Sequence, residues 1–205
     1  GVEVGEHILS VDAFDTVKQE WVTIGKNDCA FGYRNSIFKK EVNRFIICSV
    51  LFKLSKQPQL RTDYGAIKAV LHERGIRNPS VESIANAVIY IRSNKLPDPK
   101  KLGNAGSFFK NPTITKIQYD QLILQFPSLI AFPIDDNTYK IAAGWLIEAC
   151  GWKGVTKGQV GCYKDQALVI VNYGTTKGKD IFEFSEAIIE SVQSKFVVLL
   201  EREVN

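Results

Sequence analysis

The sequence predicts an α+β fold, with a β-rich first part followed by a region in which helices and strands alternate. Residues 17–24 and 45–54 are rich in the aromatic and β-branched types that favour strands. Apolar residues recur with helical spacing after Ser80 and again over 178–195. At 205 residues, the chain is long enough for one large domain or two small ones.

The first part contains two expected strands and one expected helix. Between the strands, residues 29–39 are too polar at their centre for a core strand. The second strand is so apolar around Cys48 that we expect this thiol to be free and buried. Residues 55–79 predict a loop with one short helix, ending at Asn78-Pro79.

A longer helix is expected next. Ser80 is a suitable N-cap, and apolar side chains then recur on one face as far as Arg92 and Lys95, whose charges suit the C-terminal end of the helix dipole. Residues 96–100 contain two prolines, each of which biases the preceding residue away from helix. We therefore expect an extended segment there that joins two domains.

The segment 103–112, with the sequence GNAGSFFKNP, predicts a shaped turn that presents Ser107, Lys110 and Asn111. Its glycines permit backbone conformations that other residues avoid, and they let a ligand come close. The final proline ends the segment, because it fixes its own φ and lacks an N–H donor. A loop that only connected two elements would not need two phenylalanines beside the glycines.

The remaining elements are predicted from caps, stops and apolar patterns. We expect a helix from Thr115 to about Phe126, a short helix over 142–150 that Gly151 stops, a buried strand over 167–171, an amphipathic helix over 178–195 and a final strand over 196–200.

The composition argues against several classes of function. Hydrophobic residues make up 45% and charged residues 23%, and the net charge of +4 comes from scattered basic residues, which does not suit a nucleic-acid partner. No apolar run approaches the roughly 20 residues that span a membrane, and the first residues do not resemble a signal peptide. The chain contains no methionine, and we take it for a fragment or a processed chain.

Cysteine and histidine usage predicts reduced thiols and no metal site. The four cysteines form no C-x-x-C pair, and only two histidines are present. We expect a cytoplasmic protein, where thiols stay reduced.

Three residues are candidates for catalysis. Arg34 lies among aromatic residues and suits a carboxylate held through two hydrogen bonds, although it could equally be a surface arginine stacked on a tyrosine. Ser107 is a poor acid in water but can protonate a strongly basic carbanion or enolate beside it, and the alternative is a turn serine bonded to backbone. Glu203 follows an apolar stretch near the chain end, where most glutamates are simply solvated.

Other polar residues suit a phosphorylated ligand. Lys95 and Lys110 could neutralise a diphosphate, and Asn111 and Gln166 could add amide hydrogen bonds. Taken one residue at a time, this scattered set has little specificity.

Six separated stretches place these residues in a common context. They are FGYRNSIFK at 31–39, KLPDPK at 95–100, GNAGSFFKNP at 103–112, AAGWLIEAC at 142–150, DQALVIVN at 165–172 and LEREV at 200–204. Together and in this order, they resemble the UDP-N-acetylenolpyruvoylglucosamine reductase family, also called UDP-N-acetylmuramate dehydrogenase, in its longer subtype. The resemblance covers essentially the whole chain.

The resemblance implies a bacterial cytoplasmic flavoenzyme of peptidoglycan synthesis. In such an enzyme NADPH reduces FAD, and the reduced flavin passes hydride to the enolpyruvyl ether of a UDP-sugar to give UDP-N-acetylmuramate. Ser107 would protonate the enolate formed by hydride addition, and Arg34 and Glu203 would stabilise that enolate. Tyr33 and Arg34 would contact the cofactor.

The resemblance also implies substrate contacts for Tyr64, Lys95, Asn111, Phe132 and Gln166. Tyr64 lies in the stretch RTDYG, which resembles a loop that closes over substrate in the longer subtype and would exclude water from the flavin. Phe132 stands where that subtype often has tyrosine, so this contact would lose a hydroxyl. The position of Arg202 is often proline.

In terms of domains, the resemblance implies that residues 1–95 are the second half of an FAD-binding α+β domain. Residues 96–199 would be a complete α/β substrate-binding domain, and 200–205 a tail returning toward the FAD-binding region. The family has a further FAD-binding region before the position of Gly1, including the loop that holds the flavin pyrophosphate. We therefore expect impaired FAD binding and no activity from this chain alone.

Two functions remain open at this point. One is the reductase, as a monomer whose partner is a small-molecule UDP-sugar, with no nucleic-acid or membrane partner. The alternative is a non-catalytic module that binds a UDP-sugar or another nucleotide. Binding alone would need none of Arg34, Ser107 and Glu203, which favours the reductase.

Overall fold

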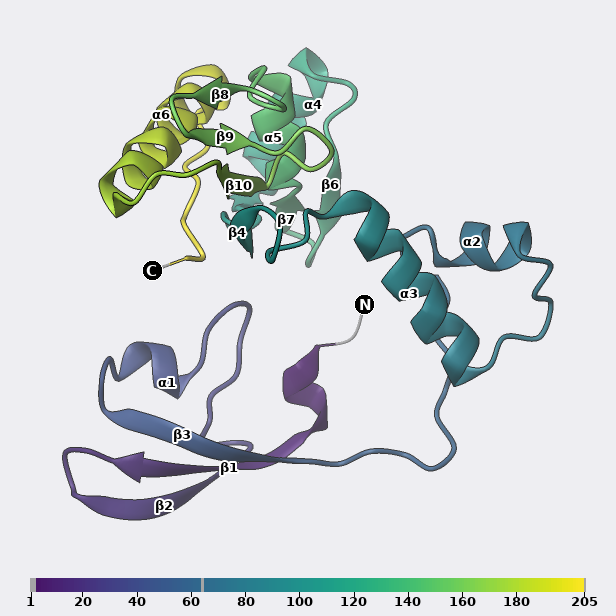
Figure 1. Ribbon diagram of the computed structural model, residues 1–205, viewed down its shortest axis with the longest axis vertical. Coiled ribbons are helices and arrows are strands. Elements are labelled where there is room, and N and C mark those ends of the chain that lie inside the picture. Colours follow the sequence, from purple (N-terminus) through teal and green to yellow (C-terminus); the bar gives the residue numbers. More distant parts are fainter. Residues whose placement is uncertain (1–2, 64, 205) are drawn as a thin grey trace. The chain divides into compact units, whose positions relative to one another are not determined.

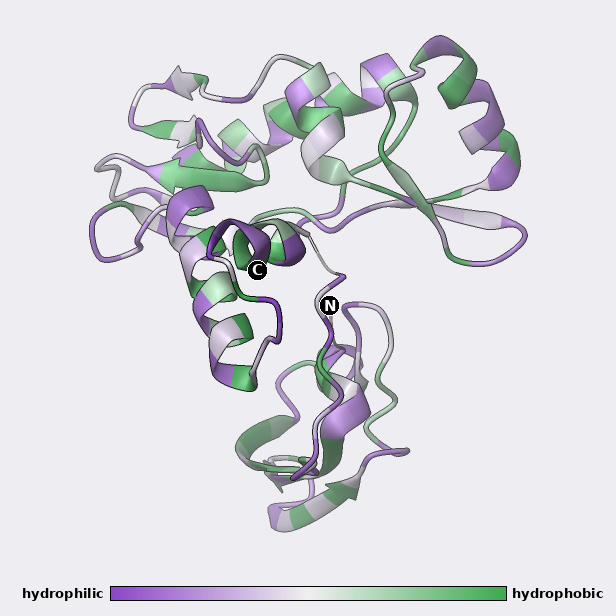
Figure 2. Ribbon diagram, turned by 90° about the vertical axis from the view of Figure 1, so that its right-hand side faces the viewer, coloured by the Kyte–Doolittle hydropathy of each residue, from purple (hydrophilic) through white to green (hydrophobic). Residues whose placement is uncertain are grey.

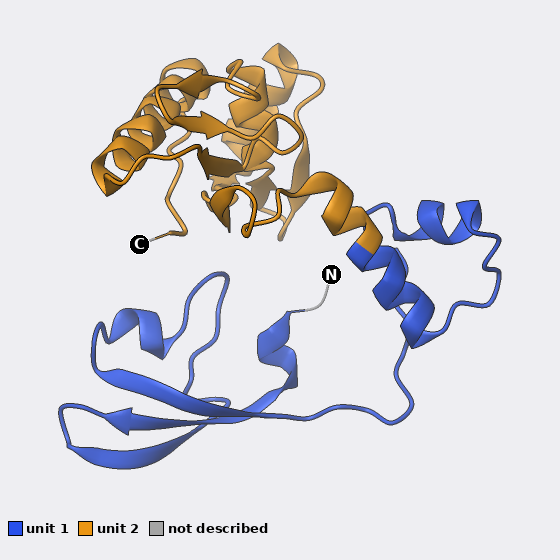
Figure 3. Cartoon of the chain, in the orientation of Figure 1, with its two compact units in different colours: residues 1–89 blue, residues 90–205 orange. Residues whose placement is uncertain are grey.

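The computed structural model describes residues 3–63 and 65–204, and it confirms the α+β class, with helices and antiparallel sheets (Figure 1). The chain divides into two compact units, unit 1 over residues 1–89 and unit 2 over residues 90–205 (Figure 3). The boundary between them falls inside helix α3 (Val81–Lys95). The domain limits expected at residues 95 and 199 stay predictions.

Unit 1 is built on one antiparallel sheet with the strand order β2-β1-β3. Its elements before α3 are η1 (Val4–His7), β1 (Ile8–Asp15), β2 (Glu20–Gly25), α1 (Ile37–Lys40), β3 (Phe45–Phe52) and α2 (Ile67–Glu73). The two predicted strands correspond to β2 and β3, and the predicted short helix to α2, so these predictions are confirmed.

Strand β3 lies almost entirely at the surface of unit 1. Residues 46–52 are all exposed, and because Cys48 is among them, the prediction of a buried thiol is wrong. The buried cluster on this sheet is small and consists of Ile8, Val11 and Cys29. An apolar sequence therefore predicted the strand correctly, but whether its faces are covered depends on what packs against the sheet.

A buried carboxylate ties the end of β1 to the loop before β3. Asp15 is 1% exposed, and it accepts hydrogen bonds from Arg44 Nε at 3.1 Å and Arg44 Nη2 at 2.9 Å. The backbone N–H groups of Val17 and Lys18 donate to the same side chain. These donors, the Arg44 guanidinium first among them, lower the pKa of Asp15 to about 2.

We expect this carboxylate to make the stability of unit 1 depend on pH in acid. Because its pKa is about 2 in the folded chain and about 3.9 in unfolded peptides, its contribution is complete above about pH 5 and is lost progressively as the pH falls through about 2. Hydrogen exchange of the β1 amides between pH 5 and pH 2 measures this loss. Asp15→Asn should flatten the pH dependence, whereas Glu20→Gln, which alters an exposed ion pair with Lys18, should not. Equal slopes in Asp15→Asn and the unmodified chain would contradict the assignment.

Unit 2 holds two antiparallel sheets, with the orders β4-β10-β9-β8 and β5-β7-β6. The first sheet contains β4 (Gly103–Ser107), β8 (Thr156–Lys157), β9 (Val160–Cys162) and β10 (Val169–Asn172). The second contains β5 (Thr113–Thr115), β6 (Ala131–Pro133) and β7 (Thr138–Ile141). The helices are α4 (Lys116–Gln125), α5 (Ala143–Ala149) and α6 (Gly178–Phe196).

Helix ends lie where local chemistry predicted them. Thr115 caps α4 through a capping box with Gln118. The Oγ of Ser80 accepts the N–H of Ser83 at 3.1 Å at the start of α3. Gly151 follows α5 in a left-handed conformation, with φ of 81°.

Helix α6 supplies a long apolar face to the core of unit 2. Phe184, Ile188, Val192 and Phe196 are buried along one stripe of the helix, which contacts α5, β9 and β10. Hydrophobic and hydrophilic residues alternate around the helices of the chain (Figure 2), as expected where one helix face is covered.

The segment 103–107 is a strand rather than the predicted turn. It forms β4, in which Ser107 lies opposite Val169 of β10. The glycine signal marks an irregularity within the strand, because the register shifts here and Gly106 has φ of 74°. Pairing with β10 therefore determines that this segment is extended, whereas its glycines permit several backbone conformations.

Two further predictions in unit 2 are wrong. The carbonyl of Asp98 accepts the N–H groups of Lys101 and Leu102, so a turn follows where an extended segment was expected. Residues 196–200 form no named strand, because α6 continues to Phe196 and then ends at Val197 in the left-handed region, with φ of 55°. The apolar alternation that favoured a strand reflects alternate burial of side chains without backbone pairing.

Candidate functional site

Unit 2 places Ser107 and Glu203 beside the same residue. Ser107 is the last residue of β4 and immediately precedes Phe108, whose carbonyl oxygen accepts the N–H of Glu203 at 2.8 Å. Ser107 is exposed, and Glu203 is partly buried and makes contacts within the protein. Two residues that are far apart in the sequence therefore lie on adjacent backbones.

The pairing of the C-terminal tail with residues 108–110 sets this arrangement. Phe109 faces Arg202 in an isolated bridge, and the N–H of Lys110 donates to the carbonyl of Glu201 at 2.9 Å. Lys110 Nζ also contacts the Glu201 carboxylate at 2.8 Å. The Lys110 ammonium group, which the sequence suggested could neutralise a diphosphate, therefore forms a salt bridge within the protein.

The two phenylalanines of the motif anchor this segment in the core. Phe108 is 7% exposed and Phe109 is 1% exposed, and their rings meet edge to face at 5.3 Å between centroids. Their burial holds the backbone on which Ser107 and the tail depend. The sequence indicated that these residues had more than a connecting role, and the structure shows that the role is packing.

Asn104 is a residue of the same motif that sequence reasoning missed. Its Nδ2 donates to the carbonyls of Leu102 at 2.9 Å and Pro97 at 3.3 Å, and its Oδ1 accepts the N–H of Gly106 at 3.0 Å. The side chain therefore fixes the backbone on both sides of itself. The available signal was an asparagine two residues before a glycine, a pattern typical of a side-chain-stabilised turn.

The amide side chains of Asn111 and Gln166 both lie at the first turn of α5. Asn111 Oδ1 accepts the N–H of Ala143 at 3.0 Å. A Cβ on Gly144 would lie 3.4 Å from Gln166 Oε1, so that amide borders the same turn. The Oε1 of Gln166 also accepts the N–H of Leu168 at 3.5 Å, so both amide oxygens are used within the protein.

The other predicted substrate residues lie elsewhere on the chain. Lys95 is exposed at the C-terminal end of α3. Phe132 is 52% exposed in β6, opposite Lys140 of β7. Tyr64 lies outside the described residues. The substrate roles of these residues, and those of Asn111 and Gln166, stay predictions.

Tyr33 and Arg34 form a tight turn in unit 1. Gly32 and Asn35 close the turn with reciprocal backbone hydrogen bonds of 2.9 and 3.1 Å. Arg34 has φ of 54°, a left-handed conformation that is unfavourable for a residue other than glycine. Both side chains are exposed and make contacts within the protein. Because Arg34 belongs to unit 1, its approach to Ser107 and Glu203 stays a prediction.

A pocket of about 410 Å³ in unit 2 adjoins the tail. Arg202 and Val204, the neighbours of Glu203, contribute to its wall together with Phe108 and Phe182. Residues of β4, β10 and the start of α6 complete the lining, which is mainly apolar. The pocket has a size suited to part of a small-molecule ligand.

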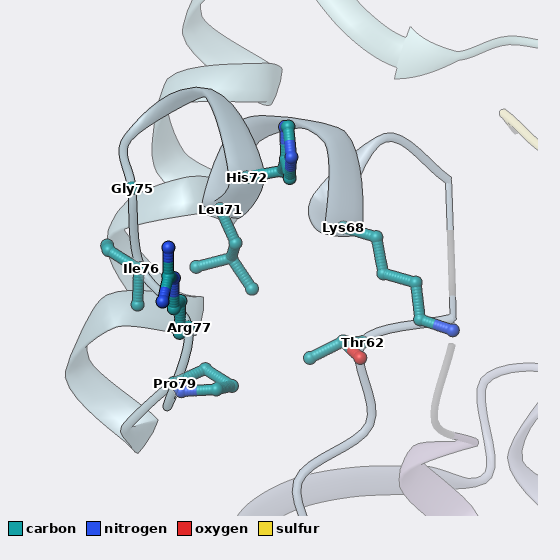
Figure 4. Close-up of a pocket in the computed structure, with 8 residues that line it drawn as sticks. All are labelled: Thr62, Lys68, Leu71, His72, Gly75, Ile76, Arg77 and Pro79. Atoms are coloured by element: carbon teal, nitrogen blue, oxygen red, sulfur yellow. The ribbon is translucent and has the colours of Figure 1, made fainter.

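A pocket of about 510 Å³ in unit 1 was not predicted from the sequence (Figure 4). Its lining residues are Thr62, Lys68, Leu71, His72, Gly75, Ile76, Arg77 and Pro79. Lys68 forms a salt bridge with Asp63, so its charge is already compensated. Thr62 and Lys68, which precede and follow Tyr64 in the sequence, therefore contribute to the wall of this pocket.

The described part of the chain contains neither a metal-binding cluster nor a membrane-spanning helix. No three His, Cys, Asp or Glu side chains among residues 3–63 and 65–204 are grouped so that they could hold a metal ion. Within the same residues, no helix has both the length and the apolar character needed to cross a bilayer.

Comparisons with known proteins agree on one family. The model of the UDP-N-acetylenolpyruvoylglucosamine reductase C-terminal domain matches residues 98–205. UDP-N-acetylenolpyruvoylglucosamine reductases from Flavobacterium johnsoniae and Pseudomonas syringae pv. syringae are each 44% identical to the chain, which they match over 100% of its length. The chain spans 61% and 60% of these two relatives.

A solved structure shows a similar fold. The crystal structure of UDP-N-acetylenolpyruvylglucosamine reductase from Thermus caldophilus matches with a TM-score of 0.56 and 22% sequence identity. The match covers 97% of this chain and 52% of that one. At this identity, the likeness supports the fold alone.

Proposed function

Because the chain belongs to the UDP-N-acetylenolpyruvoylglucosamine reductase family, we propose that it supplies the proton donor and substrate-binding surface for reduction of UDP-N-acetylglucosamine enolpyruvate. The product would be UDP-N-acetylmuramate, and the reaction would serve peptidoglycan synthesis in the bacterial cytoplasm. The observation that supports this proposal is the hydrogen bond from the Glu203 N–H to the Phe108 carbonyl, which pairs the Glu203 backbone with the residue that follows Ser107.

Residues of this chain that could contact FAD are Tyr33 and Arg34. An aromatic ring and a guanidinium on one exposed turn suit a ligand that is planar in one part and anionic in another, which describes a flavin dinucleotide. When bound, FAD would supply the transfer of hydride from NADPH to the enolpyruvyl double bond.

Ser107 would complete the reaction by donating a proton. Hydride addition to the enolpyruvyl group leaves an enolate, whose basicity makes a serine hydroxyl a competent acid. The Ser107 alkoxide would then recover its proton from solvent. Because Ser107 is exposed at the end of β4, its hydroxyl can reach a ligand without a rearrangement of the strand.

Arg34 and Glu203 would stabilise the enolate. The Arg34 guanidinium balances the negative charge that develops, and it can do so through two parallel hydrogen bonds. Glu203 would contribute to the same stabilisation from the backbone segment that pairs with Phe108. Lys95, Asn111, Phe132, Gln166 and Tyr64 would bind the diphosphate and uridine parts of the substrate.

The experiment that tests this function uses a fusion protein. The part of the Flavobacterium johnsoniae reductase that has no counterpart in this chain is joined to residues 1–205, and NADPH oxidation is followed with and without the enolpyruvyl substrate. We expect oxidation that depends on the substrate. The chain alone is assayed in parallel, and its absorbance spectrum shows whether it retains flavin.

The alternative function predicts a different result. A binding module would take up UDP-N-acetylglucosamine in calorimetry, while the fusion protein, once its flavin is reduced, would fail to pass hydride to the enolpyruvyl substrate. That combination would contradict the reductase proposal.

A further inference from the structure

We propose that Arg202 is a positioning residue that clamps the C-terminal tail to α6 and so sets Glu203 beside Ser107. The importance of that setting for the reaction rests on the proposed function. The clamp itself rests on contacts that lie entirely within unit 2.

Three closely spaced residues of α6, namely Phe182, Ser185 and Glu186, hold the Arg202 guanidinium. Its Nε donates to Ser185 Oγ at 2.7 Å, and its Nη2 forms a salt bridge with the Glu186 carboxylate. The guanidinium carbon lies 4.3 Å from the ring centroid of Phe182. Hydrogen bonding, charge and ring stacking therefore all hold the same planar group, which is a role that arginine performs better than lysine.

The Ser185 hydroxyl connects the Arg202 guanidinium to the backbone of α6. Ser185 is 0% exposed, and its Oγ donates to the Phe182 carbonyl at 2.7 Å while it accepts from Arg202. The hydroxyl thus uses its single donor and accepts one hydrogen bond. Without the guanidinium, a buried acceptor would lose its partner, which is costly in a protein interior.

The tail needs such an anchor because its backbone pairing is short. Among the described residues, its backbone pairs with residues 108–110 through an isolated bridge at Arg202 and the adjoining hydrogen bonds of Glu201 and Glu203, and the Glu201 carboxylate adds its salt bridge to Lys110. A shift of one residue in an extended pairing turns every side chain to the opposite face. By fixing its own residue against α6, Arg202 determines on which side Glu203 projects.

The first test measures the clamp in the 205-residue chain. Arg202→Met keeps much of the side-chain length but removes the guanidinium, and Arg202→Lys keeps a charge. We expect the Glu203 amide hydrogen to exchange at least about tenfold faster in Arg202→Met and by an intermediate factor in Arg202→Lys. The amides of β10 should be unchanged in both. An unchanged Glu203 amide in Arg202→Met would overturn the proposal.

The matched control is Lys195→Met. Lys195 also belongs to unit 2, where it donates to the Ala149 carbonyl and lies 5.5 Å from the Phe196 ring centroid. The Lys195→Met variant thus loses a cation and a ring contact comparable to those of Arg202, but away from the tail. Exchange of the Glu203 amide should be the same in Lys195→Met as in the unmodified chain.

The second test measures the consequence for the reaction in the fusion protein. Arg202→Met should leave the rate of flavin reduction by NADPH unchanged and slow flavin reoxidation by the enolpyruvyl substrate about 10- to 100-fold, the range that a small misplacement of a reacting group produces. Arg202→Lys should recover part of this loss. Equal slowing of both half-reactions, or no slowing of either, would overturn the positioning role.

The two proposals fail in different ways. If the unmodified fusion protein does not reduce the enolpyruvyl substrate, the proposed function is wrong, and exchange of the Glu203 amide alone decides whether the clamp exists. If the unmodified fusion protein is active and Arg202→Met matches it, only the clamp proposal is wrong.

Discussion

Replacing Ser107 by alanine is expected to slow reduction of the enolpyruvyl substrate by about 10²- to 10⁴-fold, the usual contribution of a positioned general acid. The physical reason is that the enolate left by hydride addition would then have to take its proton from water. Flavin reduction by NADPH should keep its normal rate, because it involves no proton from Ser107.

Stopped-flow absorbance of the flavin separates the two half-reactions in the fusion protein. The control variant is Ser128→Ala, which removes an exposed serine hydroxyl elsewhere in unit 2. Ser107→Cys, which keeps an ionisable proton at the same position, should retain more activity than Ser107→Ala. If Ser107→Ala and Ser128→Ala reoxidise at the same rate, Ser107 is not the proton donor.

The largest expected effect on stability is that of Ile188→Ala. Ile188 is 0% exposed in the middle of α6 and belongs to the main core of unit 2. Truncating it removes buried apolar contacts and leaves a cavity, so we expect the free energy of unfolding of unit 2 to fall by roughly 2–5 kcal/mol. Urea denaturation, followed through the unit 2 tryptophans Trp145 and Trp152 in a Trp21→Phe background, measures this change.

Ile117→Ala is the matched control for this substitution. Ile117 is also an isoleucine on a helix of unit 2, but it is 72% exposed, so its truncation should change the free energy of unfolding by less than about 0.5 kcal/mol. A similar loss in both variants would show that burial in the α6 face is not what stabilises unit 2.

Helix boundaries were the most predictable part of the fold. The hydroxyls of Ser80 and Thr115 and the left-handed glycine Gly151 act within a few residues of their own positions. The residues that make such local interactions are close together in the sequence, so the sequence alone is enough to predict them. The amphipathic stripe of α6 was equally predictable, because its spacing follows from the helix period alone.

Strand conformation and burial were less predictable, since both depend on distant partners. Residues 103–107 contain the glycines of a turn, yet β10 draws them into a sheet. Residues 196–200 alternate like a strand, yet no strand pairs with them, and Cys48 is exposed although its neighbours are apolar. In each case, strand formation or burial depended on whether a segment distant in the sequence packs or pairs with these residues.

In the candidate site, too, some features follow from the sequence and others depend on contacts between distant segments. The sequence by itself determined the family and the chemistry of each candidate, because a hydroxyl, a guanidinium and a carboxyl group are defined by residue type. Only the tertiary structure decided that the Glu203 backbone pairs with Phe108, the residue after Ser107, and that Arg202 binds α6, since backbone pairing and side-chain contacts between remote segments form when the chain folds. No spacing between residues 107, 185 and 202 encodes these contacts; they exist because the burial of Phe109 and α6 brings the three segments into one core.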